Sequence, residues 1–261
     1  MSRFSLLFPV LLCAAPGAAL AQVPSCAGPA EITRASIVRV EQNGAMILSD
    51  GRAMLLEGLR LPMGAADRAA SRHANEARAT LLSLAREGLV TGRAVAPKQD
   101  RYDRVRVQGF TATAWLQQAM LEQGLARVAI APDRSECASQ LYGFEAAARA
   151  ARRGLWADVA YRIRGNNDDW RQDIGTFQLI EGRIGRVSER DGRLVLDFGA
   201  DGRSGLRLVV AGADRAAFRK GGDPAALEGR AVRVRGVIQQ VEGRPQIGVA
   251  HRAQIELLDT K

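Results

Sequence analysis

The chain has 261 residues, a length that permits one or two domains and is ample for a sizeable core. Its 47% hydrophobic and 25% charged residues are ordinary for a soluble globular protein, and no stretch beyond the N-terminal segment approaches the ~20 apolar residues of a membrane helix. The net charge of +9 favours attraction to polyanions such as nucleic acid or anionic lipid. Because only three of the 37 basic residues are lysines, a general arginine bias is the alternative explanation.

The first 21 residues have the pattern of a cleavable signal peptide. Arg3 supplies a short basic region, and residues 6–12 form an apolar core too short to span a bilayer. Residues 19–21 fit the small-x-small cleavage rule, so the mature chain is expected to begin at Gln22, in a periplasm or outside the cell. Cys13 suggests a lipoprotein instead, but the leucine before it is larger than the usual small residue.

Two cysteines, Cys26 and Cys137, remain after cleavage at that position. An even pair in an oxidising compartment is best interpreted as a disulfide, here between the N-terminal segment and the last helix of the first domain. In the chain-entropy model, closing so long a loop stabilises the fold by up to roughly 4.7 kcal/mol. No zinc site is indicated, because His73 and His251 are scattered, and His73 is expected at the surface of an alanine-rich helix.

Strand-like and helical segments are interleaved in residues 22–160, the predicted first domain. Apolar or alternating runs between turns predict five strands, at residues 36–40, 45–48, 53–61, 89–96 and 105–110. Apolar residues at helical spacing predict three helices, at residues 67–86, 113–123 and 135–153. Glycines at the helix ends support these limits, and a short strand is expected after the second helix.

A second β-rich unit is predicted at residues 177–261, after a polar, turn-rich linker at residues 161–176. Its five strands are expected at residues 177–187, 193–198, 206–210, 231–240 and 245–250. A short helix, residues 214–218, lies between the third and fourth strands. Five strands with a helix after the third is the order of an OB fold, so this unit is predicted to be a small OB-like barrel.

The second unit offers two arginines as candidates for binding nucleic acid. Arg233 and Arg235 share one face of a predicted strand and could line a basic groove. OB folds that bind single strands also stack bases on aromatic side chains, and here the aromatic residues are few. A solvated strand face is therefore the alternative.

A motif in the first domain carries a family resemblance. Residues 100–104 read Asp-Arg-Tyr-Asp-Arg, and after a strand the next helix ends in Gln-Gly-Leu-Ala-Arg-Val at residues 123–128. This succession resembles the staphylococcal nuclease (thermonuclease-like) family over residues 32–157. The resemblance implies a five-stranded OB-type barrel with helices, and hence a mostly β, α+β fold. It also places Arg104 where the family binds the scissile phosphate, although Asp103 stands where the family usually has glycine.

Most groups that carry the family's chemistry are missing. The resemblance implies phosphodiester cleavage at a calcium site, which needs carboxylate ligands, arginines on the phosphate and a glutamate that activates water. Here the metal-binding turn reads Gln-Asn-Gly-Ala at residues 42–45, and Leu55 replaces the strand arginine. Arg60 replaces the second metal aspartate, and Met63 replaces the glutamate. No metal or other cofactor is therefore expected.

Three nearby carboxylates, those of Glu41, Glu57 and Asp67, could rebuild a calcium site only if the acids have been relocated. Asp67 fits better as a cap or first-turn acid of the following helix.

Three arginines around the motif, Arg101, Arg104 and Arg106, are candidates for binding a phosphate or another anion. The alternative for Arg104 is an ion pair with Asp100 or Asp103 at the rim of the barrel. Tyr102 is expected to be a packed turn residue rather than a platform on which bases stack.

These patterns together predict an exported, nuclease-like protein that has lost the family's catalytic groups and that binds nucleic acid or another polyanion, or acts as a scaffold in the envelope. An active calcium-dependent phosphodiesterase with relocated acids is one alternative. A periplasmic module that interacts with another envelope protein is the other.

Overall fold

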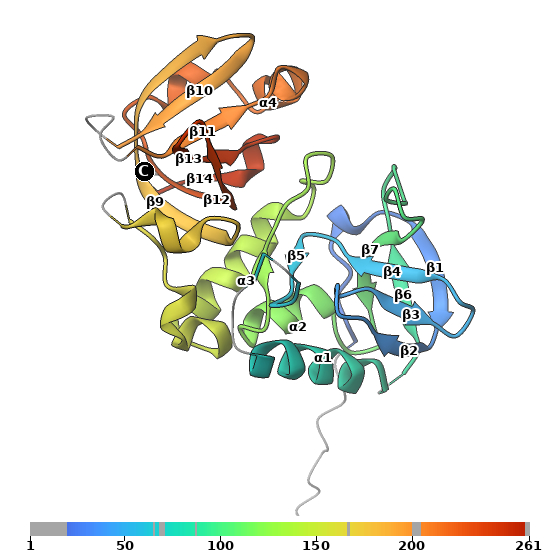
Figure 1. The fold of residues 1–261 in the computed structure, drawn as a ribbon. Helices are drawn as coiled ribbons and strands as arrows, with labels where there is room; N and C mark the ends of the chain where they lie inside the picture. Colours follow the sequence, from blue (N-terminus) through green and yellow to red (C-terminus); the bar gives the residue numbers. More distant parts are fainter. Residues whose placement is uncertain are drawn as a thin grey trace, which may run out of the picture.

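The computed structural model describes residues 20–64, 66–67, 71–86, 88–165, 168–199 and 205–258. It has the predicted mixed α+β fold, in which two β units are connected through a group of helices (Figure 1). Residues 1–19 of the predicted signal peptide and residues 68–70 of the first predicted helix lie outside the described residues. Among the helices described, none is both long and apolar enough to cross a bilayer.

The first barrel consists of six strands whose order closes on itself. They are β1 (Ala30–Ala35), β2 (Ile37–Val40), β3 (Met46–Leu48), β4 (Ala53–Leu56), β6 (Val90–Arg93) and β7 (Val105–Phe110). Their order is β1-β6-β7-β4-β3-β2, and β1 and β2 are one extended run interrupted only at Ser36. This run pairs with β6 and with β3, so the predicted five-stranded barrel is confirmed, although its first strand begins six residues earlier than predicted.

The third predicted strand, residues 53–61, is in fact divided. It bends at Gly58, whose φ of +81° favours glycine. Beyond the bend, β5 (Leu59–Arg60) leaves the barrel and pairs with β8 (Arg127–Val128) in a separate two-stranded sheet. The short strand predicted after the second helix is therefore present as β8.

Three α-helices pack on the first barrel: α1 (Ser71–Arg86), α2 (Leu116–Glu122) and α3 (Ala138–Ala150). On α1 the buried residues Ala77, Leu81 and Ala85 recur every four positions, so one apolar stripe faces the core. The helices α2 and α3 start three residues later than predicted, and Trp115 just before α2 still has an extended backbone.

His73 on α1 is buried, and the prediction that it lies at the surface is wrong. The chain after α3 folds back over α1 in two 3-10 turns, η2 (Gly154–Ala157) and η3 (Val159–Tyr161). The Nε2 atom of His73 consequently lies 2.9 Å from Oδ2 of Asp158, and its ring packs edge-on against Tyr161. The hydrogen bond with His73 contributes most to lowering the pKa of Asp158 below its ordinary value.

The predicted disulfide between Cys26 and Cys137 is present. It joins the turn η1 (Ser25–Ala27) to the residue that precedes α3, across a sequence separation of 111 residues. The N-terminal segment is thus fixed covalently to the helical side of the first barrel.

The predicted second β unit is present, with six strands rather than the five predicted. Its strands are β9 (Phe177–Arg190), β10 (Arg193–Phe198), β11 (Arg207–Val210), β12 (Ala231–Val241), β13 (Arg244–Gly248) and β14 (Ile255–Leu257). The order β13-β11-β10-β9-β12-β14 is closed by a further pairing of β12 with β13. The helix α4 (Arg215–Lys220) follows β11, and a buried apolar cluster that includes Phe198, Phe218 and Leu196 fills the interior. The remaining 3-10 turns are η4 (Trp170–Asp173), η5 (Gly212–Asp214), η6 (Pro224–Leu227) and η7 (Arg252–Gln254).

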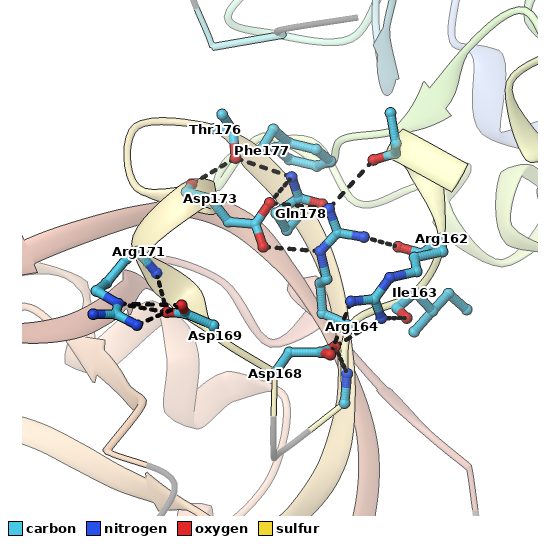
Figure 2. A network of polar contacts seen from close by, with 12 residues as sticks. Arg162, Ile163, Arg164, Asp168, Asp169, Arg171, Asp173, Thr176, Phe177 and Gln178 are labelled. Atoms are coloured by element: carbon cyan, nitrogen blue, oxygen red, sulfur yellow. Dashed lines mark hydrogen bonds and ion pairs between the residues drawn. The ribbon is translucent and has the colours of Figure 1, made fainter. Parts of the chain in front are cut away.

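The segment predicted as a linker makes its own polar network at the start of the second barrel (Figure 2). Arg164 binds both carboxylate oxygens of Asp173, with distances of 2.8 and 3.0 Å from Nε and Nη2. The side-chain amide of Gln178 donates to Asp173 and to Thr176, at 3.1 and 2.9 Å. All four of these residues are buried, so this part of the connection is packed rather than freely extended.

The two barrels contact each other through β5, β8 and α3. Arg127 on β8 donates to the carbonyl oxygen of Phe177 at 2.6 Å, and the N–H of Phe177 donates to the carbonyl of Ala66 at 3.0 Å. The guanidinium carbons of Arg60 and Arg127 lie 5.1 and 4.8 Å from the centre of the Phe177 ring, which are cation–π distances. The first residue of β9 therefore anchors the second barrel to the edge of the first.

Candidate functional site

An open hollow of about 430 Å³ lies at one rim of the first barrel. Its walls come from the end of β4, from residues 100–106 and from the segment that follows β8. The charged side chains that line it are Glu57, Asp100, Arg104, Arg106 and Asp133. Two of the predicted anion-binding arginines, Arg104 and Arg106, thus lie in one hollow, beside the Leu55 and Asn43 positions that align with the family's lost groups.

Arg104 is paired with Asp100. Its Nε and Nη2 atoms lie 2.8 and 2.6 Å from Oδ2 of Asp100. The backbone N–H groups of Tyr102 and Arg104 donate to the other carboxylate oxygen, at 2.9 and 3.1 Å. Burial alone would raise the pKa of Asp100, but these hydrogen bonds outweigh it and hold the pKa below its ordinary value. The turn thus uses Arg104 as an internal partner.

Arg106 joins two carboxylates across the hollow. Its Nε lies 2.6 Å from Oε2 of Glu57, and its two terminal nitrogens lie 2.9 and 3.0 Å from the carboxylate oxygens of Asp133. The bidentate contact is the main cause that lowers the pKa of Asp133. Because Asp133 belongs to the segment after β8, this arginine connects that segment to β4 and β7.

The hollow does not fit a calcium ion. Calcium takes six to eight oxygen ligands, usually with several carboxylates among them. Each of the three carboxylates here is hydrogen-bonded to Arg104 or Arg106, so a metal would have to displace a guanidinium. Across the described residues, no group of three or more His, Cys, Asp or Glu side chains is arranged to hold a metal ion.

Arg60, which aligns with a metal carboxylate of the family, lines an adjoining hollow of about 160 Å³ that shares Asn43, Leu55 and Ala129 with the first. Its guanidinium contacts the ring of Phe177 in the second barrel. Burial, together with the nearby charge of Arg127, lowers the pKa of Arg60. Arg60, whose cation contacts the second barrel, therefore occupies the position where the resemblance predicts a metal-binding aspartate.

Glu41 and Asp67, the other two carboxylates that could have rebuilt a calcium site, lie outside the hollow. Glu41 pairs with Arg39 at 3.2 Å on the surface. Asp67 accepts hydrogen bonds from Arg127 and from the hydroxyl of Tyr161, both at 2.7 Å, and its side chain is buried. Asp67 therefore takes part in the junction between the barrels, and the residues that it was predicted to cap, 68–70, lie outside the described residues.

Tyr102 is exposed at the rim of the hollow, and the prediction that it packs into the turn is wrong. Its exposed fraction is 61%, and the guanidinium carbons of Arg101 and Arg104 lie 4.8 and 5.0 Å from its ring centre. Asp103, the next residue of the turn, has a φ of +59°. The result is an exposed aromatic ring next to two cations.

Arg233 and Arg235, the two candidates in the second barrel, lie at the junction. Arg235 is 1% exposed and donates to Glu145 of α3 at 2.9 and 3.1 Å, and also to Glu256. Arg233 pairs with Glu181 at 2.5 Å and with Glu256 at 3.4 Å. Burial excludes the predicted contact between Arg235 and an external polyanion. Sequence patterning missed this because the acid that meets Arg235 is 90 residues away in the chain.

Comparison with known proteins supports the resemblance. Residues 54–158 match the family model described as staphylococcal nuclease homologue. No curated protein matches the chain. The matched range runs from β4 past the end of α3 and includes the charged residues of the hollow. Residues 54–158 therefore form a staphylococcal nuclease homologue domain.

Proposed function

We propose that this protein is an exported, nuclease-like protein that binds nucleic acid or another polyanion without cleaving it. The observation that carries the proposal is the pairing inside the hollow, where Glu57, Asp100 and Asp133 are all bonded to Arg104 or Arg106. The carboxylates that metal-assisted hydrolysis requires are already neutralised by the protein's own cations.

The same pairing argues against a relocated catalytic base. Glu57 lines the hollow, but Arg106 is hydrogen-bonded to one of its oxygens and the N–H of Gly58 to the other, at 2.6 and 3.1 Å. A general base needs a free oxygen within reach of the attacking water. Leu55 and Met63 offer no donor at the other aligned positions.

Binding of a polyanion is supported by the family, by the net charge of +9 and by the rim of the hollow. Arg101 is exposed and has no carboxylate partner among the described residues, and it lies against the exposed ring of Tyr102. A cation beside an aromatic ring suits a phosphate next to a base.

Export is supported by the disulfide, because disulfides persist in oxidising compartments. Together with the N-terminal pattern, it favours a periplasmic or secreted protein that is cleaved after Ala21.

The test is a combined cleavage and binding assay on the purified chain from Gln22 onward. Fluorescent single- and double-stranded DNA and RNA are incubated with calcium, with magnesium or with a chelator. We expect no cleavage under any condition, and binding that weakens steeply with salt but is unchanged by the chelator. Chelator-sensitive cleavage that is lost in Arg104→Ala would overturn the proposal. A folded protein that neither cuts nor binds would leave only a protein-interaction module.

A further inference from the structure

Five arginines of the second barrel lie on one outer face of its strands, called here the arginine face: Arg186, Arg190, Arg193, Arg207 and Arg244. The strand register places them there. Arg190 is opposite Arg193, and Asp197 lies between Arg186 on β9 and Arg207 on β11. Arg244 is two positions before Gln246, the residue opposite Arg207 on β13. Residues at the intervening positions, Leu194 and Leu196, point into the core, so the arginines point outward.

Most of these guanidinium groups are exposed and have no described carboxylate partner, in contrast to those of Arg104 and Arg106 in the hollow. Arg207 pairs with Asp197, its neighbour on β10, at 3.4 Å. The other four arginines are exposed, and no described carboxylate lies within 4.0 Å of them. Arg190 and Arg193 face each other directly across the β9–β10 hairpin, which is unfavourable for two like charges until an anion lies between them.

The arginines of this face lie along a curved path and do not form a flat patch. Strands are about 4.8 Å apart and side chains on one face recur about every 6.8 Å, so Arg186, Arg207 and Arg244 are separated by roughly 8–10 Å steps. These steps cross a small closed barrel from β9 to β13. A flexible single strand can follow such a curve, whereas a duplex, whose persistence length is about 150 base pairs, can touch only part of it.

Aromatic side chains are missing from this face. The three phenylalanines of residues 177–261, Phe177, Phe198 and Phe218, are all buried. Single-strand binders that stack bases need exposed rings, so the arginine face can hold only the phosphates of a strand. In Figure 1, β10 lies on the side of the second barrel away from α3, so the junction leaves the face open.

We infer that the arginine face binds the phosphate backbone of single-stranded nucleic acid, with the bases directed away from the protein. The inference rests on the proposed function and specifies where, and by which chemistry, the polyanion is held. If only the phosphates are bound, the affinity does not depend on the base composition of the strand.

The test compares two variants of the chain from Gln22 onward that carry equal charge changes. In the first, Arg186, Arg190, Arg193 and Arg244 are changed to Gln. In the control, four exposed arginines from elsewhere are changed to Gln: Arg39, Arg86, Arg152 and Arg171. The probes are a fluorescent oligothymidylate and an abasic oligodeoxynucleotide of the same length, titrated from low to high salt. Circular dichroism verifies that both variants are folded.

For the unaltered protein we expect a slope of log K against log salt of about −3.5, from five phosphate contacts on a single strand. The four-arginine variant should lose at least about tenfold in affinity at low salt and reduce the slope to about −0.7, while the control keeps most of the affinity. The abasic strand should bind as tightly as oligothymidylate.

Three results would overturn the inference. Equal losses in the two variants would show that net charge alone attracts the strand. A much weaker abasic strand would place the binding at stacked bases, and so at Tyr102. A sulfated polysaccharide could also displace the oligonucleotide at a concentration of anionic groups far below that of the oligonucleotide's phosphates. That result would assign the face to another class of polymer. In each of these cases the unaltered protein still binds, so the proposed function would stand. It would fail only if the unaltered protein bound neither probe.

Discussion

The two barrels have the same strand order and nearly the same charge, but they use arginine in opposite ways. Residues 22–160 contain 18 basic and 14 acidic residues, and residues 177–261 contain 15 and 11. In the first barrel Arg104 and Arg106 point into a hollow and bind carboxylates. In the second, most of the arginine face has no described carboxylate partner. Net charge therefore does not identify a binding surface, whereas the pairing of each guanidinium does.

The junction shows a third use of arginine. Arg60, Arg127 and Arg235 are directed from one barrel toward the other and meet an aromatic ring, a carbonyl oxygen or a buried carboxylate there. Arginine suits such places because its guanidinium stays charged and binds in a planar, bidentate manner. The contrast between internal and external arginines can be tested by removing members of each set.

The largest effect is expected from Arg235→Met. The change removes the guanidinium that Glu145 and Glu256 share and leaves them only the longer contacts, both 3.4 Å, with Arg149 and Arg233; the side chain of Glu145 is 1% exposed. Removing one member of a buried pair destabilises a protein by about 3–5 kcal/mol. Urea unfolding should show this loss, whereas Arg171→Met, in an exposed pair with Asp169, should leave the midpoint unchanged. Equal midpoints for both variants would contradict the distinction between internal and external arginines.

The next effect concerns the covalent link, which only the first barrel has, because residues 177–261 contain no cysteine. Replacing Cys26 and Cys137 by Ala should lower the free energy of unfolding by about 2–5 kcal/mol, since the unfolded chain regains the entropy of a loop of 111 residues. Chemical unfolding with and without a reducing agent measures it. The reducing agent should lower the stability of the unaltered protein to that of the variant and leave the variant itself unchanged.

Much of the fold could be predicted because it depends on local patterns. Alternation located both β units, and the hairpin turn at Asp191 and Gly192, with φ values of +49° and +72°, lies between the strands predicted at residues 177–187 and 193–198. The division of the third strand at Gly58 could not be predicted, because the partner of β5 is β8, almost 70 residues later. Tertiary pairing decided the boundary there, not propensity.

Part of the candidate site was also predictable from the sequence alone. The positions of Leu55, Arg60 and Met63 indicated that the metal ligands are missing, since one sequence is enough to see which donors are absent. The partners of the remaining arginines were not predictable. Arg106 meets Asp133 and Arg235 meets Glu145 only because distant segments pack together. Patterning therefore identifies which groups are present, and the three-dimensional structure decides which of them are free.

A smaller effect is expected at the anchor of the second barrel. Arg60→Met keeps the apolar part of the side chain but removes the cation over Phe177, so a loss of about 1 kcal/mol in the free energy of unfolding is expected. Combining it with Phe177→Leu in a double-mutant cycle isolates this contact. The two losses should add to more than the loss in the double variant. Simple additivity would mean that Arg60 and Phe177 do not interact, and that the arginine at this position has no docking role.

The smallest effect is a pH dependence that separates the internal pairs from exposed acids. The pKa of Asp100 is lowered in the folded state, so its pairing with Arg104 stabilises the fold fully above the unfolded value of about 3.9 and is lost as the pH falls through the folded pKa. Asp100→Asn should therefore be less stable than the unaltered protein at pH 6, and the difference should shrink as the pH falls below about 4. The matched control is Asp103→Asn in the same turn, whose carboxylate has no ion-pair partner among the described residues and whose positive φ suits asparagine. Denaturant unfolding at a series of pH values measures both variants. A difference for Asp100→Asn that stays constant down to pH 2 would mean that the pair with Arg104 contributes no charge-dependent stability, and that Arg104 is as free to bind an anion as the arginines of the second barrel.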